Sequence, residues 1–187
     1  MLNNDIDYQK AVDVIKSGGV IAYPTESVYG IGGDPFNNDV VEKILSIKNR
    51  PLAKGMILVC ASFEQAKDLI ALDSLSKKHI DHLLSKWPGP YTFIVPASDK
   101  VPKSITGYKD TVAIRVSSNP TICKLCSLYG KPIISTSCNV TGEQPLLTYD
   151  MVRTRFENLI DFILDDKVEG LQNTTSIVNL LTGEVLR

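Results

Sequence analysis

The sequence has few histidines, no evident covalent nucleophile and no long apolar run. Its two histidines, His79 and His82, fall on a segment with the pattern of an amphipathic helix, which indicates a surface position. No Ser-His-Asp or Cys-His arrangement stands out. No apolar stretch approaches the roughly 20 residues that a membrane-spanning helix needs. These absences argue against a membrane protein and against an enzyme that works through a covalent protein intermediate.

Neither sign of charge is in excess. With 20 Lys and Arg against 21 Asp and Glu, the formal net charge is −1. This balance argues against a surface that binds any nucleic acid through its cations, although a local basic patch stays open. The N-terminus lacks the basic and apolar runs of a signal peptide, so we expect a cytoplasmic protein. We therefore expect reduced and mostly buried thiols at the four cysteines, Cys60, Cys123, Cys126 and Cys138.

The standard nucleotide and metal motifs are also missing. The glycines at 30–33 lack the G-x-G-x-x-G spacing of a dinucleotide loop, and no G-x-x-x-x-G-K-[ST] phosphate loop occurs. Cys123 and Cys126 have the spacing of half a zinc site, but they fall on a predicted helix without a second pair, which favours packing. No carboxylate cluster suggests a dedicated metal cage, so any metal ligands are unknown at this stage.

Helical and strand-like patterns alternate along the chain, which at 187 residues has the size of one ordinary domain. We expect a single domain over residues 1–187. The predicted helices are 8–17, 39–47, two segments within 62–85, 120–130 and 148–158. The predicted strands are 20–23, 56–60, 91–96, 111–117, 131–137 and 162–166, with a C-terminal hairpin through Thr182-Gly183. Residues 25–33 read as a glycine-rich loop. This order predicts an α/β fold with a mixed parallel and antiparallel sheet.

Three cations gather at the end of the predicted helix 39–47: Lys48, Arg50 and Lys54. They would repel one another unless an anion were bound among them. An arginine fork and a lysine point charge together suit phosphate groups. The alternative is a solvated helix end, where cations favour the negative end of the helix dipole. In either case we expect Lys48 and Arg50 at a loop surface.

A cluster of hydroxyl and amide side chains follows the predicted strand 131–137. Ser135, Ser137 and Asn139 could bind a phosphate or the polar groups of an amino acid. A tight turn that caps the next segment would use the same residue types. The cluster alone does not decide between these two interpretations.

Arg115 lies inside the apolar predicted strand TVAIRVS, where an unpaired guanidinium would be costly to bury. It therefore needs a carboxylate partner. That partner is either structural, such as Glu26 or an Asp from a neighbouring strand, or the carboxylate of a bound substrate.

Six ordered blocks resemble the YrdC-like family, from about residue 8 to the end of the chain. They are PTESVYGIGGDP (24–35), KNRP (48–51), KGMILV (54–59), WPGPYTF (87–93), VAIRVS (112–117) and STSCNVTGEQP (135–145). Within that family the chain is similar to its short bacterial members, which make threonylcarbamoyl-adenylate. The resemblance implies a twisted sheet with flanking helices around a deep basic cleft.

The resemblance also implies a reaction and its participants. L-threonine, bicarbonate and ATP would give L-threonylcarbamoyladenylate and pyrophosphate, for the threonylcarbamoyladenosine modification of tRNA. Mg²⁺ would accompany ATP, and the downstream tRNA threonylcarbamoyl-transferase proteins would be partners. The implied threonine contacts are Thr25, Arg115, Ser135 and Thr175. The ATP contacts are Lys48, Arg50, Ser137, Asn139 and Arg187, with Lys54 close behind the first two.

Two rival functions stay open at the level of sequence. An RNA-binding module of the same fold would bind tRNA directly without making an adenylate, but the net charge and the lack of an aromatic and basic platform weigh against it. Carbamoyl-adenylate chemistry, as in hydrogenase maturation proteins, would bring acylphosphatase and zinc-finger segments that this chain lacks.

Overall fold

Helices and strands alternate along most of residues 2–170 and 175–186, the ranges that the computed structural model describes. The helices are α1 (Leu2–Lys16), α2 (Asn38–Lys48), α3 (Phe63–Lys67), α4 (Lys77–Lys86), α5 (Lys103–Thr106), α6 (Pro120–Tyr129) and α7 (Tyr149–Phe156), with 3-10 turns η1 (Leu52–Lys54) and η2 (Leu72–Ser74). Asn37 accepts two backbone N–H groups at the start of α2, and Asn119 accepts one at the start of α6. Asn49 follows the last residue of α2, and its left-handed φ of 46° turns the chain. The helices expected from the sequence are confirmed, and α5 is additional.

The described strands form two sheets. They are β1 (Ile21–Pro24), β2 (Tyr29–Gly32), β3 (Ile57–Cys60), β4 (Tyr91–Pro96), β5 (Thr111–Val116), β6 (Ile133–Ile134), β7 (Thr136–Ser137), β8 (Phe162–Ile163) and β9 (Ser176–Asn179). One sheet has the order β7-β2-β1-β8 and the other β6-β3-β5-β4-β9. Both sheets mix parallel and antiparallel pairs, which confirms the predicted α/β class.

The prediction of a loop over residues 25–33 is partly wrong, because residues 29–32 form β2, antiparallel to β1. The glycines there serve close packing rather than a turn. A Cβ added to Gly32 would lie 1.9 Å from the carbonyl oxygen of Ile134, and one added to Gly30 would lie 3.0 Å from Thr25 Cγ2. Only glycine lets β2 approach β6 so closely.

The single strand predicted at 131–137 is also wrong, since it divides into two short strands in different sheets. Strand β6 pairs with β3, and β7 pairs with β2. Ser135 therefore sits at the crossing point between the sheets. The C-terminal hairpin is confirmed by the antiparallel bridge between Val178 and Val185.

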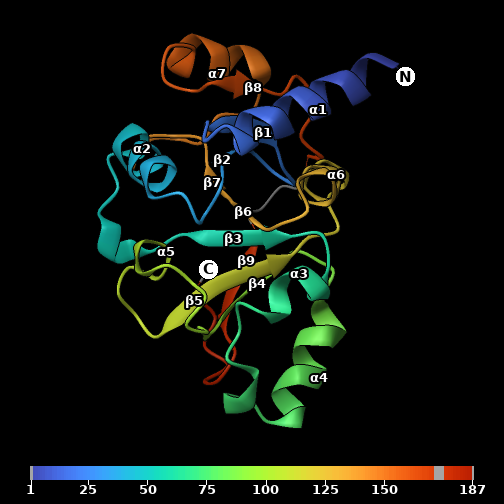
Figure 1. Cartoon of the computed structure of the whole chain (residues 1–187), viewed down its shortest axis with the longest axis vertical. Helices are drawn as coiled ribbons and strands as arrows, with labels where there is room; N and C mark the ends of the chain where they lie inside the picture. The colour runs from blue at the N-terminus through green and yellow to red at the C-terminus, as the bar shows by residue number, and fades with distance from the viewer. Residues whose placement is uncertain (1, 171–174, 187) are drawn as a thin grey trace.

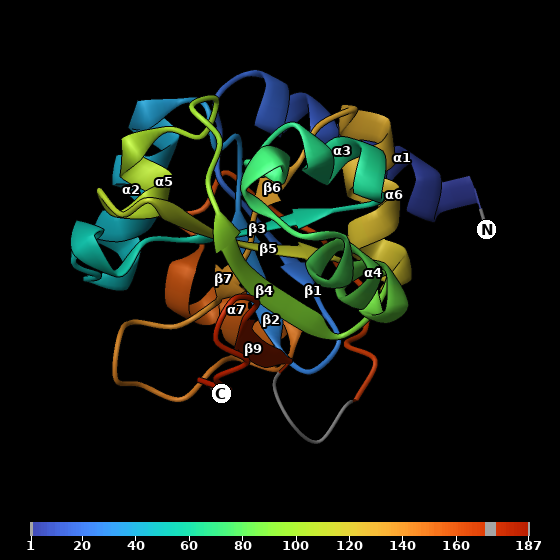
Figure 2. The same cartoon turned by 90° about the horizontal axis from the view of Figure 1, so that it is seen from below.

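The two sheets pack against a shared core, and helices cover the outside. Ile31 of β2 and Ile114 of β5 belong to one buried cluster. In Figure 1, α1 and α7 lie over the four-stranded sheet, whereas α4 lies at the opposite end of the molecule, beyond the five-stranded sheet. Figures 1 and 2 both show α2 beside α5, and α6 beside α1. None of the helices in the described ranges is long and apolar enough to cross a bilayer.

The cysteines behave as the sequence predicts. All four are free, with Cys60, Cys126 and Cys138 buried and Cys123 partly exposed. Burial raises the pKa of Cys60 and of Cys138 to about 12, so both thiols stay protonated near neutral pH. Cys123 and Cys126 lie on α6, where their Sγ atoms donate to the carbonyls of Ser117 at 3.1 Å and of Val59 at 3.5 Å.

Candidate functional site

A cavity of about 320 Å³ lies between the two sheets. Its walls are the turn between β1 and β2, the segment from Arg50 to Ile57, strands β4, β5 and β9, and the connection between β6 and β7. This size falls at the lower end of the range for small-molecule sites. Most of the predicted site residues line it: Thr25, Arg50, Lys54, Arg115, Ser135, Ser137 and Thr175.

Three predicted site residues are not among the lining residues. Lys48 and Asn139 lie behind the wall of the cavity, bonded to each other. Arg187 falls outside the described residues, so its expected role at the ATP site stays a prediction. The roles assigned to individual lining residues stay predictions as well, because the cavity shows proximity and not occupancy.

Cationic side chains outnumber acidic ones among the described lining residues. The cations of the lining are Arg50, Lys54, Lys109 and Arg115. Glu26 is the one carboxylate among the described residues of the lining. Sequence reasoning missed Lys109, which carries no motif and merely precedes β5. Such a surplus of positive charge suits a polyanionic ligand.

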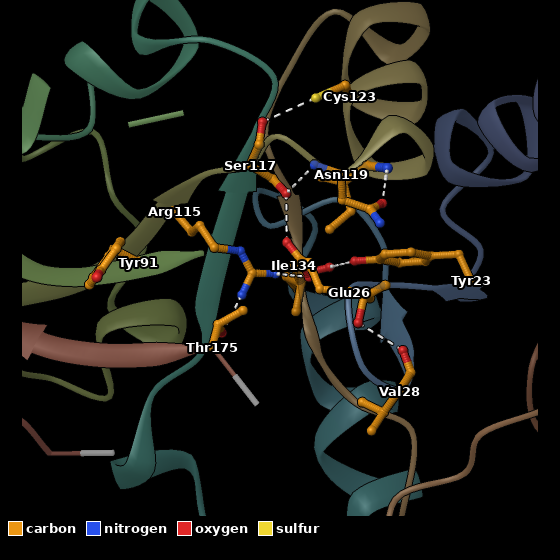
Figure 3. A network of polar contacts seen from close by, with 12 residues as sticks. Tyr23, Glu26, Val28, Tyr91, Arg115, Ser117, Asn119, Cys123, Ile134 and Thr175 are labelled. Carbon is orange, nitrogen blue, oxygen red and sulfur yellow. Dashed lines mark hydrogen bonds and ion pairs between the residues drawn. The ribbon is translucent and has the colours of Figure 1, made fainter. Parts of the chain in front are cut away.

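Arg115 lies in the inner wall, held between two partners from different elements. Its Nη2 forms an ion pair with Glu26 Oε2 at 3.3 Å, and its Nη1 donates to Thr175 Oγ1 at 2.6 Å. Figure 3 shows the guanidinium between these two side chains. Nε is buried and has no acceptor among the described residues. The structural partner that the sequence left open is therefore Glu26, and the guanidinium keeps unused donors.

Thr25 and Glu26 are placed by a tight turn between β1 and β2. The backbone N–H of Thr25 donates to the Val28 carbonyl at 3.0 Å, and its Oγ1 donates to the same oxygen at 2.7 Å. The Thr25 carbonyl in turn accepts the backbone N–H of Glu169 at 3.2 Å. Both side chains are buried, so the turn fixes where they face.

Arg50 is half-buried on the opposite part of the lining. The left-handed Asn49 ends α2, and the backbone N–H of Arg50 donates back to the Leu45 carbonyl at 3.0 Å. Its Nε and Nη2 both donate to the Gly55 carbonyl, at 3.1 and 2.9 Å. Burial lowers the pKa of the guanidinium, but it stays charged. The unused Nη1 edge is available to an anion.

The expectation that Lys48 lies at a loop surface is wrong. It is the last residue of α2 and only 3% exposed. Its Nζ donates to the carbonyls of Ser137 and of Asn139, the latter at 2.9 Å, and lies 3.4 Å from Asn139 Oδ1. Its own carbonyl accepts from Thr141 N at 2.8 Å and Thr141 Oγ1 at 2.9 Å. Lys48 thus joins α2 to the turn after β7, because that turn presents carbonyls that need donors.

The burial of Lys48 makes the free energy of unfolding depend on pH. Desolvation, with a smaller effect from the Arg50 charge, lowers its pKa from 10.5 to about 8. Between those values the unfolded chain binds more protons than the native one, so the stability of the wild type rises with pH. We expect the wild type to gain roughly 1 to 3 kcal/mol over Lys48→Met between pH 8 and pH 10.5, and nothing below pH 8. Urea unfolding of both proteins at several pH values measures this, and a constant difference would contradict it.

No metal cage stands out within residues 2–170 and 175–186. No three His, Cys, Asp or Glu side chains are grouped there as ligands. The expectation of Mg²⁺ with ATP therefore stays a prediction.

The family model and the most similar relatives place this chain in the same protein family. The model of the Sua5/YciO/YrdC family, described as "Telomere recombination", matches residues 13–187. Relatives of this chain include proteins called threonylcarbamoyl-AMP synthase from two bacteria. The one from Vibrio campbellii is 39% identical over 181 residues, covering 97% of this chain and 98% of its own, and the one from Klebsiella pneumoniae is 42% identical over 189 residues, covering 100% and 99%.

The fold comparison agrees. The crystal structure of P. abyssi Sua5 complexed with L-threonine is similar, with a TM-score of 0.87 and 31% identity. The match covers 96% of this chain and 53% of the Sua5 chain, so this chain spans about half the length of that protein.

Proposed function

This chain belongs to the Sua5/YciO/YrdC family, and from that premise we infer that it forms L-threonylcarbamoyladenylate from L-threonine, bicarbonate and ATP. Relatives that match it over nearly their whole length carry that activity in their name. The enzyme is thus a nucleotidyltransferase that releases pyrophosphate. Its product is an activated carbamoyl group, destined for the threonylcarbamoyladenosine of tRNA through downstream transferase proteins.

The observation that carries the threonine assignment is Arg115 in the wall of the cavity. A guanidinium in the wall of a cavity is the group that best binds a carboxylate. Hydroxyls of Thr25, Ser135 and Thr175 line the same cavity. They suit the hydroxyl and carbamate oxygens of a small polar amino acid. These contacts support a threonine subsite between β5 and the turn after β1.

The phosphate groups of ATP suit the other cations of the lining. Arg50, Lys54 and Lys109 would together place three positive charges along a triphosphate. Ser137 lies in the same lining and offers a hydroxyl to a phosphoryl oxygen. We propose Lys48 and Asn139 as part of this subsite through the turn that they hold, next to Ser137.

The reaction needs no protein nucleophile, in agreement with the sequence. The neutral amine of threonine captures carbon dioxide with release of a proton, or bicarbonate with release of water, and becomes a carbamate. A carbamate oxygen then attacks the α-phosphorus of ATP while the bond to pyrophosphate breaks. The protein orients the two substrates and stabilises negative charge on the phosphoryl oxygens. Mg²⁺ bound to the phosphates would neutralise part of the same charge.

Lys109 gives a test of the phosphate side that sequence reasoning did not foresee. Lys109→Met should raise the KM for ATP by about 3- to 10-fold, because an exposed cation contributes on the order of 1 kcal/mol to anion binding. The KM for L-threonine should stay within twofold. Lys103→Met, which removes an exposed lysine from α5 outside the described lining, is the matched control. An unchanged KM for ATP in Lys109→Met would remove that residue from the ATP site.

Product identification tests the proposed function itself. The purified chain is incubated with ATP, Mg²⁺, ¹³C-bicarbonate and ¹⁵N-L-threonine. The nucleotides are then separated by chromatography, and their masses are measured by mass spectrometry. We expect an adenylate that contains both labels. An adenylate with neither label, or none at all, would refute the assignment and favour the RNA-binding module, which a gel shift with tRNA would then test.

A further inference from the structure

Glu26 is a buried carboxylate for which the reaction above has no task. It is only 4% exposed, although it lines the cavity. Its Oε2 pairs with Arg115 Nη2, and its Oε1 accepts the Ser117 hydroxyl at 2.8 Å. Both oxygens are therefore committed to partners on β5 or directly after it. A free proton acceptor would have one oxygen open toward the substrate.

Ser117 lies outside the described lining of the cavity and binds Glu26 on the side away from it. Its Oγ donates to Glu26 and accepts the backbone N–H of Asn119 at 3.1 Å. Asn119 in turn caps α6, accepting the backbone N–H of Ile122 at 3.0 Å. Figure 3 shows this chain of contacts running from the start of α6 through Ser117 and Glu26 to Arg115. The orientation of Arg115 is thus tied to a helix that does not touch the ligand space.

We propose that Glu26, held by Ser117, is the positioning residue that orients the guanidinium of Arg115 for the carboxylate of the amino-acid substrate. This inference rests on the proposed function and deepens it. Glu26 and Thr175 fix two corners of the guanidinium, on Nη2 and Nη1. The guanidinium is thereby held in one orientation, so binding the substrate does not require ordering an arginine side chain.

The charge of Glu26 also supports a positioning role. An arginine buried to this extent is costly without a counter-ion, and Glu26 supplies one while the cavity is empty. Because Ser117 anchors Glu26, the ion pair with Glu26 holds the guanidinium in one position. The substrate carboxylate then binds to an arginine that is already in place.

Ser117→Ala tests the proposal at a residue outside the described lining. Losing one hydrogen bond to a charged group should raise the KM for L-threonine by about 5- to 10-fold, with the KM for ATP within twofold. The matched control is Thr121→Ala, which removes a buried hydroxyl on the neighbouring helix that bonds Tyr8 instead. Both variants should lose similar stability, but the control should keep the wild-type KM for L-threonine. A purely structural role would lower stability in both and leave that KM unchanged in both.

Glu26 itself is tested together with Arg115. Glu26→Gln should raise the KM for L-threonine by about 10-fold or more, and Glu26→Asp should recover part of that loss, because it keeps the charge. In the Arg115→Ala background, Glu26→Gln should cause no additional rise, since Glu26 acts only through Arg115. An additive rise, or a lower KM in Glu26→Gln, would overturn the proposal.

Failure of this inference differs from failure of the proposed function. If the wild type shows no threonine-dependent product, the function itself is wrong. If the wild type turns over and Ser117→Ala and Glu26→Gln both have its KM for L-threonine, only the positioning role is refuted. Calorimetric binding of L-threonine to each variant gives the same comparison without turnover.

Discussion

Arg115→Ala should raise the KM for L-threonine by about 100-fold, with little change in the KM for ATP. The expected loss is about 3 kcal/mol, the contribution of a charge-assisted contact to a carboxylate in a buried site. Arg115 is 5% exposed and lines the cavity. Water that fills its place in the variant would not supply the charge of the guanidinium. Steady-state kinetics with each substrate varied in turn measures the two KM values.

The control for this variant separates binding from folding. Removing Arg115 leaves Glu26 buried without a cation, which costs about 3 to 5 kcal/mol of unfolding free energy. The double variant Glu26→Gln/Arg115→Ala removes that buried charge and should recover much of the stability. It should not recover the affinity for L-threonine. If the double variant had the wild-type KM for L-threonine, Arg115 would serve only in a structural ion pair with Glu26.

Arg50→Ala should lower kcat/KM for ATP by about 100- to 1,000-fold, while the chain stays folded. Removing one preorganised donor to transition-state charge typically costs that much. Stability should change little, because the Arg50 side chain is half-buried and, among the described residues, its guanidinium donates to the Gly55 carbonyl alone. Arg153→Ala on α7 is the matched control, since it removes an exposed arginine paired with Glu157. Pyrophosphate release by Arg50→Ala at the wild-type rate would contradict the phosphate assignment.

The alternation of helices and strands could be predicted from the sequence, because most elements have strong local signals. Capping by Asn37, Ser76 and Asn119 and the apolar runs of β3 and β5 lie in the local pattern itself. Strand β2 could not be recognised, since its glycines look like loop residues. They are required by the approach of β6, which is about 100 residues away in the chain. Contacts over such distances leave no periodicity in the sequence.

The lining of the site could be predicted in part. Resemblance and residue chemistry together named residues that the fold brings into one cavity, among them Arg50, Arg115 and Ser137. The burial of Lys48 was missed, because a lysine beside an arginine and a proline reads as a surface cluster. Its position depends on carbonyls of the turn after β7, which only the fold reveals. Lys109 carries no pattern that would have predicted its place in the lining.

Release of pyrophosphate that depends on L-threonine is the direct sign that this chain makes threonylcarbamoyl-adenylate. The purified chain is assayed with ATP, Mg²⁺ and bicarbonate, with and without L-threonine, and with Arg115→Ala in parallel. We expect release that requires L-threonine and that needs about 100-fold more of it in the variant. Release that is independent of L-threonine would refute the proposed reaction, and equal release by both proteins at low L-threonine would refute the role of Arg115.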